Sequence, residues 1–206
     1  MLNRRHLAFA AAAAVLAAGI ATAQGAGPVI GQPAPNFSAL DADGQTRSLS
    51  QYRGKTVVLE WTNHECPYVR KHYSGSMQAL QRDATRDGVV WLSIVSSAPG
   101  QQGHVTGAQA KQLTASRGAS PTAVLLDPQG QVGRLYGAKT TPHMFVISPQ
   151  GRLVYAGGID DVPSNEVEDL QRAKPLVRLA LADVKAGRAV ATPVSRPYGC
   201  GVKYKA

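Results

Sequence analysis

The chain has 206 residues, of which 44% are hydrophobic, and a formal net charge of +9 at pH 7. This length is enough for one domain with a hydrophobic core, and two cysteines are too few for a disulfide-rich scaffold. Because the lysines and arginines are scattered singly rather than gathered in a dense block, the composition favours an ordinary soluble surface and no nucleic-acid partner.

Residues 1–23 have the pattern of an export signal. Arg4 and Arg5 lie in a basic segment, residues 7–20 are apolar, and Ala21-Thr22-Ala23 is an A-x-A cleavage site. A retained membrane anchor is the alternative, but the apolar run is shorter than the ~20 residues that span a bilayer. We therefore expect a periplasmic or secreted protein without stable membrane insertion, and the adjacent arginines leave a twin-arginine route open.

The following segments predict a hairpin and then a β-α-β unit. A Gly- and Pro-rich lead-in at 25–35 precedes two short strands, at 37–40 and 46–49, which flank a turn at 41–44. The apolar, β-branched runs 57–61 and 89–96 are typical of strands buried on both faces. Residues 68–86, between them, have the periodicity of one helix.

The remaining segments complete a predicted domain over residues 24–186. They are a polar loop (98–107), a short helix (108–117), a buried strand (122–126), a second short helix (129–136), a hairpin of strands 143–148 and 152–157, and a long helix (166–186) interrupted by Pro175. The inner stripe of that helix is predicted to be Val167, Leu170, Val177, Leu181 and Val184. A basic tail, 187–206, carries Cys200 between two glycines.

Cys66 lies where the first buried strand has ended and a helix begins. Pro67 suits the first helical position, because its φ angle is preset and it lacks an N–H. Cys66 is therefore expected at or beside the N-cap, where free backbone N–H groups and the helix dipole stabilise a thiolate. This position makes Cys66 a candidate nucleophile.

The order of these elements, with a cysteine after the first main strand, resembles the thioredoxin superfamily. The segments Gly31-Gln32-Pro33-Ala34-Pro35-Asn36-Phe37, Asn63-His64-Glu65-Cys66-Pro67-Tyr68-Val69 and Gly199-Cys200-Gly201-Val202-Lys203-Tyr204 are similar to a peroxiredoxin-like, AhpC/TSA-type redoxin group. The resemblance covers residues 28–204 and implies an α/β thioredoxin-like fold: a central mixed β-sheet flanked by helices, with an N-terminal redoxin extension. It also implies a cis bond between Thr141 and Pro142, facing Cys66.

Two motifs of the wider superfamily are incomplete in this chain. The Cys-x-x-Cys of thioredoxins has Val69 in its second cysteine position, so a local dithiol is impossible. The Pro-x-x-x-Thr-x-x-Cys of peroxiredoxins, which orients a peroxide, has Leu59 and Asn63 in place of its proline and threonine. The sequence therefore leaves open whether a disulfide or a peroxide is the substrate.

Cys200 is a candidate resolving thiol for Cys66, in a two-cysteine cycle between distant partners. The alternatives are a structural disulfide with Cys66 and a free tail thiol. His64 and His143 are candidates to lower a thiol pKa or to move a proton, against the interpretation that each is a surface or satisfied histidine.

Three further side chains near Cys66 in the sequence have open roles. Glu60, in a strand that otherwise reads as buried, either transfers a proton or sits at the strand end facing solvent or a cation. Glu65 is a second carboxylate that would raise the thiol pKa, and His72 is interpreted as a helix-surface residue.

Together these features predict an exported thiol-disulfide oxidoreductase or peroxiredoxin-like antioxidant enzyme. Its predicted site residues are Cys66, Cys200, Thr141, Pro142, His64 and His143. Its partners would be protein thiols or disulfides, or a peroxide, together with an external thiol reductant, and no cofactor is expected. The alternative is a metal-binding or non-catalytic thioredoxin-fold protein that uses Cys66 and nearby histidines, although no close Cys-x-x-Cys or His-x-x-His spacing supports a metal.

Overall fold

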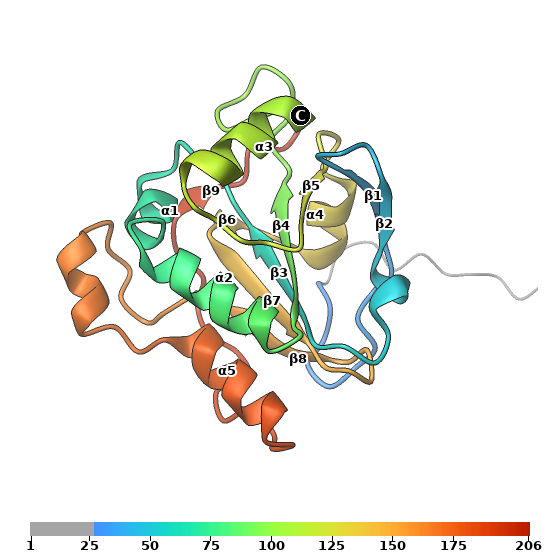
Figure 1. Ribbon diagram of the computed structural model, residues 1–206, viewed down its shortest axis with the longest axis vertical. Helices are drawn as coiled ribbons and strands as arrows, with labels where there is room; N and C mark the ends of the chain where they lie inside the picture. Colours follow the sequence, from blue (N-terminus) through green and yellow to red (C-terminus); the bar gives the residue numbers. More distant parts are fainter. Residues whose placement is uncertain (1–26) are drawn as a thin grey trace, which may run out of the picture.

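A seven-stranded mixed sheet forms the centre of the protein (Figure 1). The computed structural model describes residues 27–206, so the predicted export signal lies outside the described part of the chain. The strand order is β2-β1-β5-β4-β3-β7-β8, with β3, β4 and β5 parallel and the other pairs antiparallel. The strands are β1 (Ser38–Asp41), β2 (Thr46–Ser48), β3 (Val57–Trp61), β4 (Val90–Val95), β5 (Ala123–Leu126), β7 (His143–Ile147) and β8 (Leu153–Gly157).

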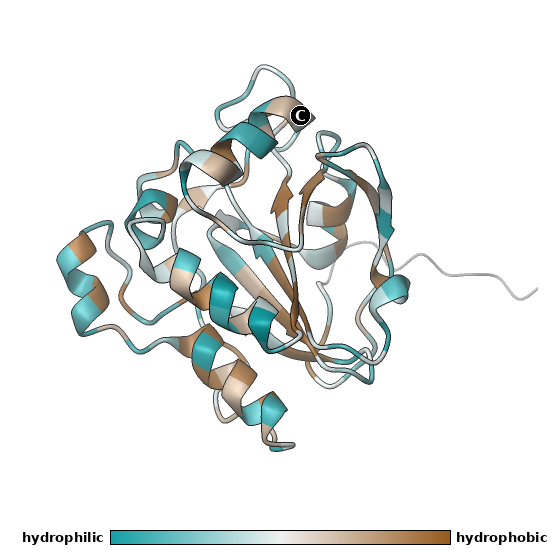
Figure 2. Cartoon of the chain, in the orientation of Figure 1, coloured by the Kyte–Doolittle hydropathy of each residue, from teal (hydrophilic) through white to brown (hydrophobic). Residues whose placement is uncertain are grey.

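Helices cover both faces of this sheet. They are α1 (Pro67–His72), α2 (Ser76–Arg86), α3 (Gly107–Ser116), α4 (Gln131–Tyr136) and α5 (Leu176–Lys185), with 3-10 helices η1 (Leu49–Tyr52) and η2 (Val167–Gln171). One hydrophobic cluster packs α4 against the sheet, a second packs α2 and α5 against the opposite face, and a smaller third one includes Ala110 of α3. All five residues of β3 are buried, and Figure 2 shows the central strands as the most hydrophobic part of the chain. The predicted thioredoxin-like α/β fold is confirmed.

The helix predicted over 68–86 is two helices. α1 ends at His72, and α2 begins after Gly75, whose φ of +142° is a conformation that residues with a side chain rarely adopt. The hydroxyls of Ser74 and Ser76 donate to the carbonyls of Lys71 and His72, so side-chain donors contribute to the hydrogen bonding at the break.

The long helix predicted over 166–186 is also divided. Pro175 is the N-cap of α5, and the residues before it form only the short η2. Val177 is fully buried as expected, whereas Val167 is 46% exposed, because η2 does not continue the axis of α5 onto the sheet.

The tail forms contacts that the sequence did not predict. Residues 193–195 lie along the outer edge of β8: Ala156 N donates to Pro193 O at 3.0 Å, and Ser195 N donates to Ala156 O at 3.2 Å. The tail then forms β9 (Cys200–Gly201), which pairs antiparallel with β6 (Thr140–Thr141). Strands of two residues are too short to show the alternation of polar and apolar residues by which strands are predicted from a sequence. Across residues 27–206, no helix has the length and apolar character needed to cross a bilayer.

Candidate active site

Cys66 is the N-cap of α1 and has no exposed surface. Pro67 occupies the first helical position, as the sequence predicts. The Cys66 thiol donates to Thr141 O, with Sγ and O 3.1 Å apart, and the Thr141–Pro142 peptide bond is cis. The start of α1 and the β6–β7 segment therefore meet at this thiol.

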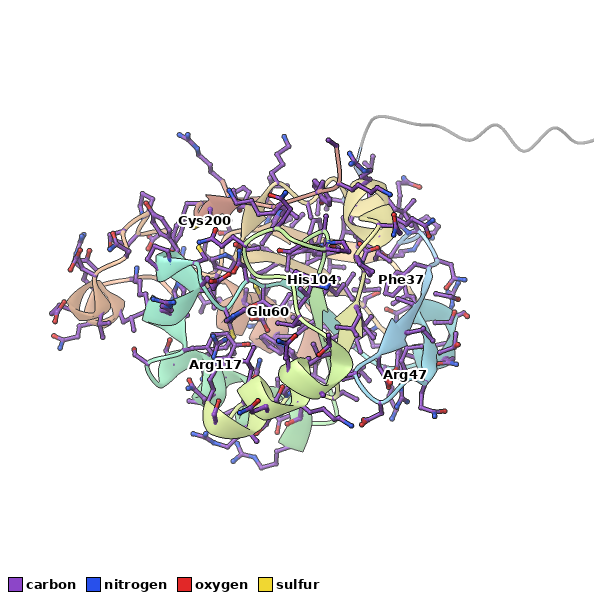
Figure 3. All side chains as sticks on the ribbon, turned by 90° about the horizontal axis from the view of Figure 1, so that it is seen from above. Phe37, Arg47, Glu60, His104, Arg117 and Cys200 are labelled. Atoms are coloured by element: carbon purple, nitrogen blue, oxygen red, sulfur yellow. The ribbon has the colours of Figure 1, made fainter. Side chains whose placement is uncertain are left out.

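Cys200 reaches Cys66 through the β6–β9 pairing. The Cα of Cys200 lies opposite that of Thr141, and the Thr141 hydroxyl donates to Cys200 O at 3.4 Å. Both cysteines are free, and this pairing places Cys200 opposite the residue whose carbonyl bonds to the Cys66 thiol. Figure 3 shows Cys200 on the tail, beside the first helix. Two thiols far apart in the sequence, one buried and one half-buried, thus share one site.

Gly199 allows the tail to approach this closely. A Cβ atom at this position would lie 2.1 Å from Thr141 O, and the φ of Gly199 is +134°. The glycine beside Cys200 is therefore required for close packing against the cis peptide, in addition to any flexibility that it gives the tail.

The two thiols differ in acidity. Burial opposes ionisation of Cys66, but hydrogen bonds from the Cys200 thiol, from the main chain at Val69 and Cys200, and from Thr141 outweigh it, so the pKa of Cys66 is lowered. Burial, followed by the hydrogen bond and the negative charge of Cys66, raises the pKa of Cys200 to about 12. Cys66 is thus the more acidic thiol of the pair, and Cys200 the less acidic one.

We expect a pH titration of the reduced protein, followed by the ultraviolet absorbance of the thiolate, to show one step below the ordinary thiol value of about 8.5. The step should vanish in Cys66→Ser, and Cys200 should then ionise at a lower pH than in the wild type, because the neighbouring negative charge is gone. In Cys200→Ala the step should remain but move upward, because a stabilising hydrogen bond is lost. A low-pH step that survives in Cys66→Ser would contradict this assignment.

The two predicted histidines lie near the cysteines in the fold but do not bind them. His143 is buried, accepts a hydrogen bond from Lys139 N at 3.3 Å and packs on Phe145. Burial, assisted by the charge of Lys139, lowers the pKa of His143 to about 4, so it is neutral at pH 7. Burial also lowers the pKa of His64. Within residues 27–206 no hydrogen bond links either imidazole to a thiol, so neither supplies a positive charge to Cys66 by direct contact.

Glu60 is fully buried, so the expectation of a solvent-facing or cation-paired carboxylate is wrong. Its oxygens accept hydrogen bonds from four neutral side chains: Trp91 Nε1 at 2.8 Å, Ser93 Oγ at 2.8 Å, Tyr73 Oη at 2.9 Å and Gln81 Nε2 at 3.2 Å. A carboxylate buried in this way is stabilised by its donors rather than by a counter-ion. The strand pattern identified Glu60 as anomalous but gave no sign of its partners.

The loop before Cys66 is fixed by residues whose role the sequence did not indicate. Asn63 is buried, its Oδ1 accepts from Glu65 N at 2.9 Å, and its Nδ2 donates to Gln102 O at 3.3 Å. The carboxylate of Glu65 accepts from Gly103 N at 2.5 Å, so it is turned toward the neighbouring loop. A Cβ atom at Gly103 would lie 2.2 Å from Asn63 Oδ1, which explains the need for glycine there.

His72 is buried rather than on the helix surface, which corrects the sequence interpretation. It lies beside Lys71, Asp160 and Tyr198, whose side chains form a polar cluster at the end of α1. Asp160 and Tyr198 come from parts of the chain distant from α1, so no local pattern marks the cluster. In the described part of the chain, no three His, Cys, Asp or Glu side chains are grouped so as to hold a metal ion.

A comparison with protein families identifies the family of this chain. Residues 30–156 match the model of the AhpC/TSA family. The chain belongs to the AhpC/TSA family. The match includes Cys66 and the cis-Pro142 segment but stops before the tail that carries Cys200. No curated protein sequence matches the chain.

Solved structures share the fold of this AhpC/TSA-family chain. A hypothetical protein from Sinorhizobium meliloti is 24% identical, with a TM-score of 0.73, and the match covers 86% of this chain and 96% of that one. An uncharacterized conserved protein from Geobacillus kaustophilus is 24% identical, with a TM-score of 0.73 and coverage of 86% and 93%. A proposed thiol:disulfide interchange protein, DsbE, from Chlorobium tepidum is 25% identical, with a TM-score of 0.51 and coverage of 63% and 84%.

Proposed function

We propose that this protein is an exported thiol-disulfide oxidoreductase in which Cys66 attacks and Cys200 resolves. The Cys66 thiolate attacks a disulfide R–S–S–R′, forms the mixed disulfide Cys66–S–S–R and releases R′–S⁻. Cys200 then loses its proton and attacks the Cys66 sulfur, which forms the Cys66–Cys200 disulfide and releases R–S⁻. An external dithiol returns both cysteines to the reduced state by the reverse exchange.

The observation that carries this proposal is the pairing of β9 with β6. It places the second of the chain's two cysteines opposite Thr141, whose carbonyl bonds to the Cys66 thiol, so the two thiols lie near each other. The unequal acidity of the thiols suits the two roles, because the thiolate is the attacking species and the resolving thiol is protonated until its turn. Cys66 has no exposed surface, so its sulfur has to become accessible before an external disulfide can react with it.

A disulfide fits the site better than a peroxide. The position that carries threonine in the peroxide-orienting motif is Asn63, and its amide bonds to the main chain at Glu65 and Gln102. The Thr141 hydroxyl donates to Cys200 O. The description of the Chlorobium tepidum structure as a thiol:disulfide interchange protein supports thiol exchange as the reaction class. The peroxide reaction, in which Cys66 becomes a sulfenic acid and Cys200 condenses with it to release water, is the second candidate.

Export belongs to the proposal because residues 1–23 have the pattern of a cleaved signal. The compartment would be the periplasm or the exterior, where disulfides are stable and a thiol-exchange protein has substrates. The reaction as written needs no bound cofactor, only an external thiol reductant.

Stoichiometric oxidation of the reduced protein tests the proposal. We expect an excess of a small disulfide to give an intramolecular Cys66–Cys200 bond, identified by peptide mapping, and to do so much faster than an equal concentration of hydrogen peroxide. A peroxide reaction that is the faster of the two would favour the second candidate. A Cys66 sulfinic acid beside an untouched Cys200 thiol would end the resolving role of Cys200.

A further inference from the structure

Tyr198 joins the tail to the helix that begins at Cys66. Its hydroxyl donates to Asp160 Oδ1 and lies 3.1 Å from His72 Nε2. Its ring meets that of Tyr68 edge-on at 5.9 Å, and Lys71 Nζ lies 5.6 Å from the ring centroid. Tyr68, Lys71 and His72 all belong to α1, so Tyr198 fixes a point two residues before Cys200 to the helix that carries Cys66.

Asp160 is the centre of this contact and is itself held in place. Its side chain is buried, Val162 N donates to its Oδ1 at 3.0 Å, and Lys71 Nζ lies 3.7 Å from its Oδ2. The Lys71 side chain is fully buried and also donates to Val162 O at 3.2 Å. Asp160 Oδ2 has no hydrogen bond within residues 27–206, so Tyr198 and Val162 supply the hydrogen bonds of this carboxylate.

The protonation states of the cluster keep Tyr198 a donor. Burial, followed by its hydrogen bond to Asp160 and the negative charge of that residue, raises the pKa of Tyr198 far above its usual value. Burial lowers the pKa of His72 to about 4, so at pH 7 the charge of Lys71 is the one that faces Asp160. The contact is therefore a charge-assisted hydrogen bond in a partly buried position, which is stronger than one between neutral groups.

A second anchor holds the tail on the other side of Cys200, but it does not touch α1. Val202 N donates to Lys139 O at 3.1 Å, and Tyr204 Oη donates to Ala138 O at 2.7 Å. The Tyr204 ring also lies 4.8 Å from the guanidinium of Arg134 in α4. Of the two tyrosines that flank Cys200, only Tyr198 therefore relates the tail to the helix of the attacking thiol.

We propose that Tyr198 is a positioning residue, which holds the tail on α1 through Asp160 and thereby sets the effective concentration of the Cys200 thiol at Cys66. This rests on the proposed function, in which these two thiols form a disulfide. A group that is already held near its partner loses less conformational entropy on reaction, so tethering favours the bonded state. Tyr198 should accordingly act on the redox equilibrium of the pair without contacting either sulfur.

Equilibration with glutathione measures this effect directly. The reaction is protein dithiol plus glutathione disulfide, giving protein disulfide plus two reduced glutathione, and its equilibrium constant contains the effective concentration. We expect Tyr198→Phe, which keeps the ring and removes the hydroxyl, to lower this constant about tenfold, the size of one lost hydrogen bond to a charged group. Tyr198 belongs to none of the three hydrophobic clusters, so the variant should fold.

Tyr136→Phe is the matched control. It also removes one buried tyrosine hydroxyl, which donates to Pro35 O at 2.7 Å, but it has no contact with the Tyr198 cluster. It should lower the free energy of unfolding while leaving the glutathione equilibrium constant unchanged. Equal constants for Tyr198→Phe and the wild type would overturn the proposal. A wild-type protein that forms no Cys66–Cys200 disulfide at all would overturn both this proposal and the proposed function, so the two failures are distinguishable.

Alkylation of the reduced protein gives a second measurement. Here Tyr198→Phe should increase a rate constant, whereas it should decrease the glutathione equilibrium constant. Cys66 is buried and the tail pairs with β6 beside it, so loosening the Tyr198 anchor should make Cys66 react faster with a small alkylating reagent. We expect about a tenfold faster reaction of Cys66 in Tyr198→Phe at a fixed pH, and no change in Tyr136→Phe. An unchanged rate in Tyr198→Phe would show that this hydroxyl does not hold the tail.

Discussion

Replacing Cys66 with serine should reduce disulfide-exchange turnover at least a thousandfold, to the rate of the reaction without protein. The reason is that a hydroxyl at this position is not ionised at neutral pH and is a poor nucleophile toward sulfur, whereas the Cys66 thiolate is stabilised by several hydrogen bonds. The measurement is turnover of a dithiol–disulfide substrate pair, monitored by release of the product thiol. The helix cap and the tail contacts do not depend on the sulfur, so the fold should be retained.

The matched variant Cys200→Ser should behave differently. It keeps the attacking thiol and lacks the resolving one, so a mixed disulfide between Cys66 and half of the substrate should accumulate and be visible by mass spectrometry. Turnover should fall but not vanish, since an external thiol is able to release the trapped half. Equal activity of Cys66→Ser and the wild type would contradict the mechanism and leave only the interpretation that the site binds a partner.

Replacing Glu60 with alanine should lower the free energy of unfolding by about 3–5 kcal/mol. Four buried donors, on Tyr73, Gln81, Trp91 and Ser93, would lose their acceptor at once, and a cavity would remain in β3. For a domain of this size, such a loss corresponds to a melting temperature lower by roughly 10 °C. Urea unfolding of the reduced protein measures it without a contribution from the disulfide.

Two further variants sharpen the test of Glu60. Glu60→Gln keeps one acceptor oxygen and the volume of the side chain, so its loss of stability should lie between those of the wild type and the alanine variant. Glu166→Ala, at an exposed carboxylate, should change the unfolding free energy by less than about 0.5 kcal/mol. A change below 1 kcal/mol in Glu60→Ala would mean that the hydrogen bonds around this carboxylate do not stabilise the fold.

The parts of the structure that the sequence predicted are those that a short segment specifies by itself. The apolar run of β3 and the Cys66-Pro67 pair each carry a local physical reason for their conformation, namely burial on both faces and a preset first helical position. The breaks at Gly75 and Pro175 were harder to predict, because the periodicity on either side resembles that of one continuous helix.

The rest of the site depends on contacts between distant segments. The Cys66–Cys200 proximity follows from a two-residue strand pair whose partners are 59 residues apart, and the bond between His72 and Tyr198 spans 126 residues. Neither contact leaves a periodic signal in the sequence. Burial of His72 likewise results from packing by the tail and by the loop at Asp160, so the helix pattern alone placed it wrongly on the surface.

The tail also protects an edge of the sheet. β8 is the last strand of the sheet, and its free side presents main-chain N–H and C=O groups that another chain is able to pair with. Residues 193–195 occupy part of that side through their bonds to Ala156, while β2 at the opposite edge is only three residues long. Removing the whole tail to eliminate Cys200 would therefore expose this edge of the sheet and promote self-association. Point substitutions of Cys200 avoid that effect, so they separate thiol chemistry from aggregation.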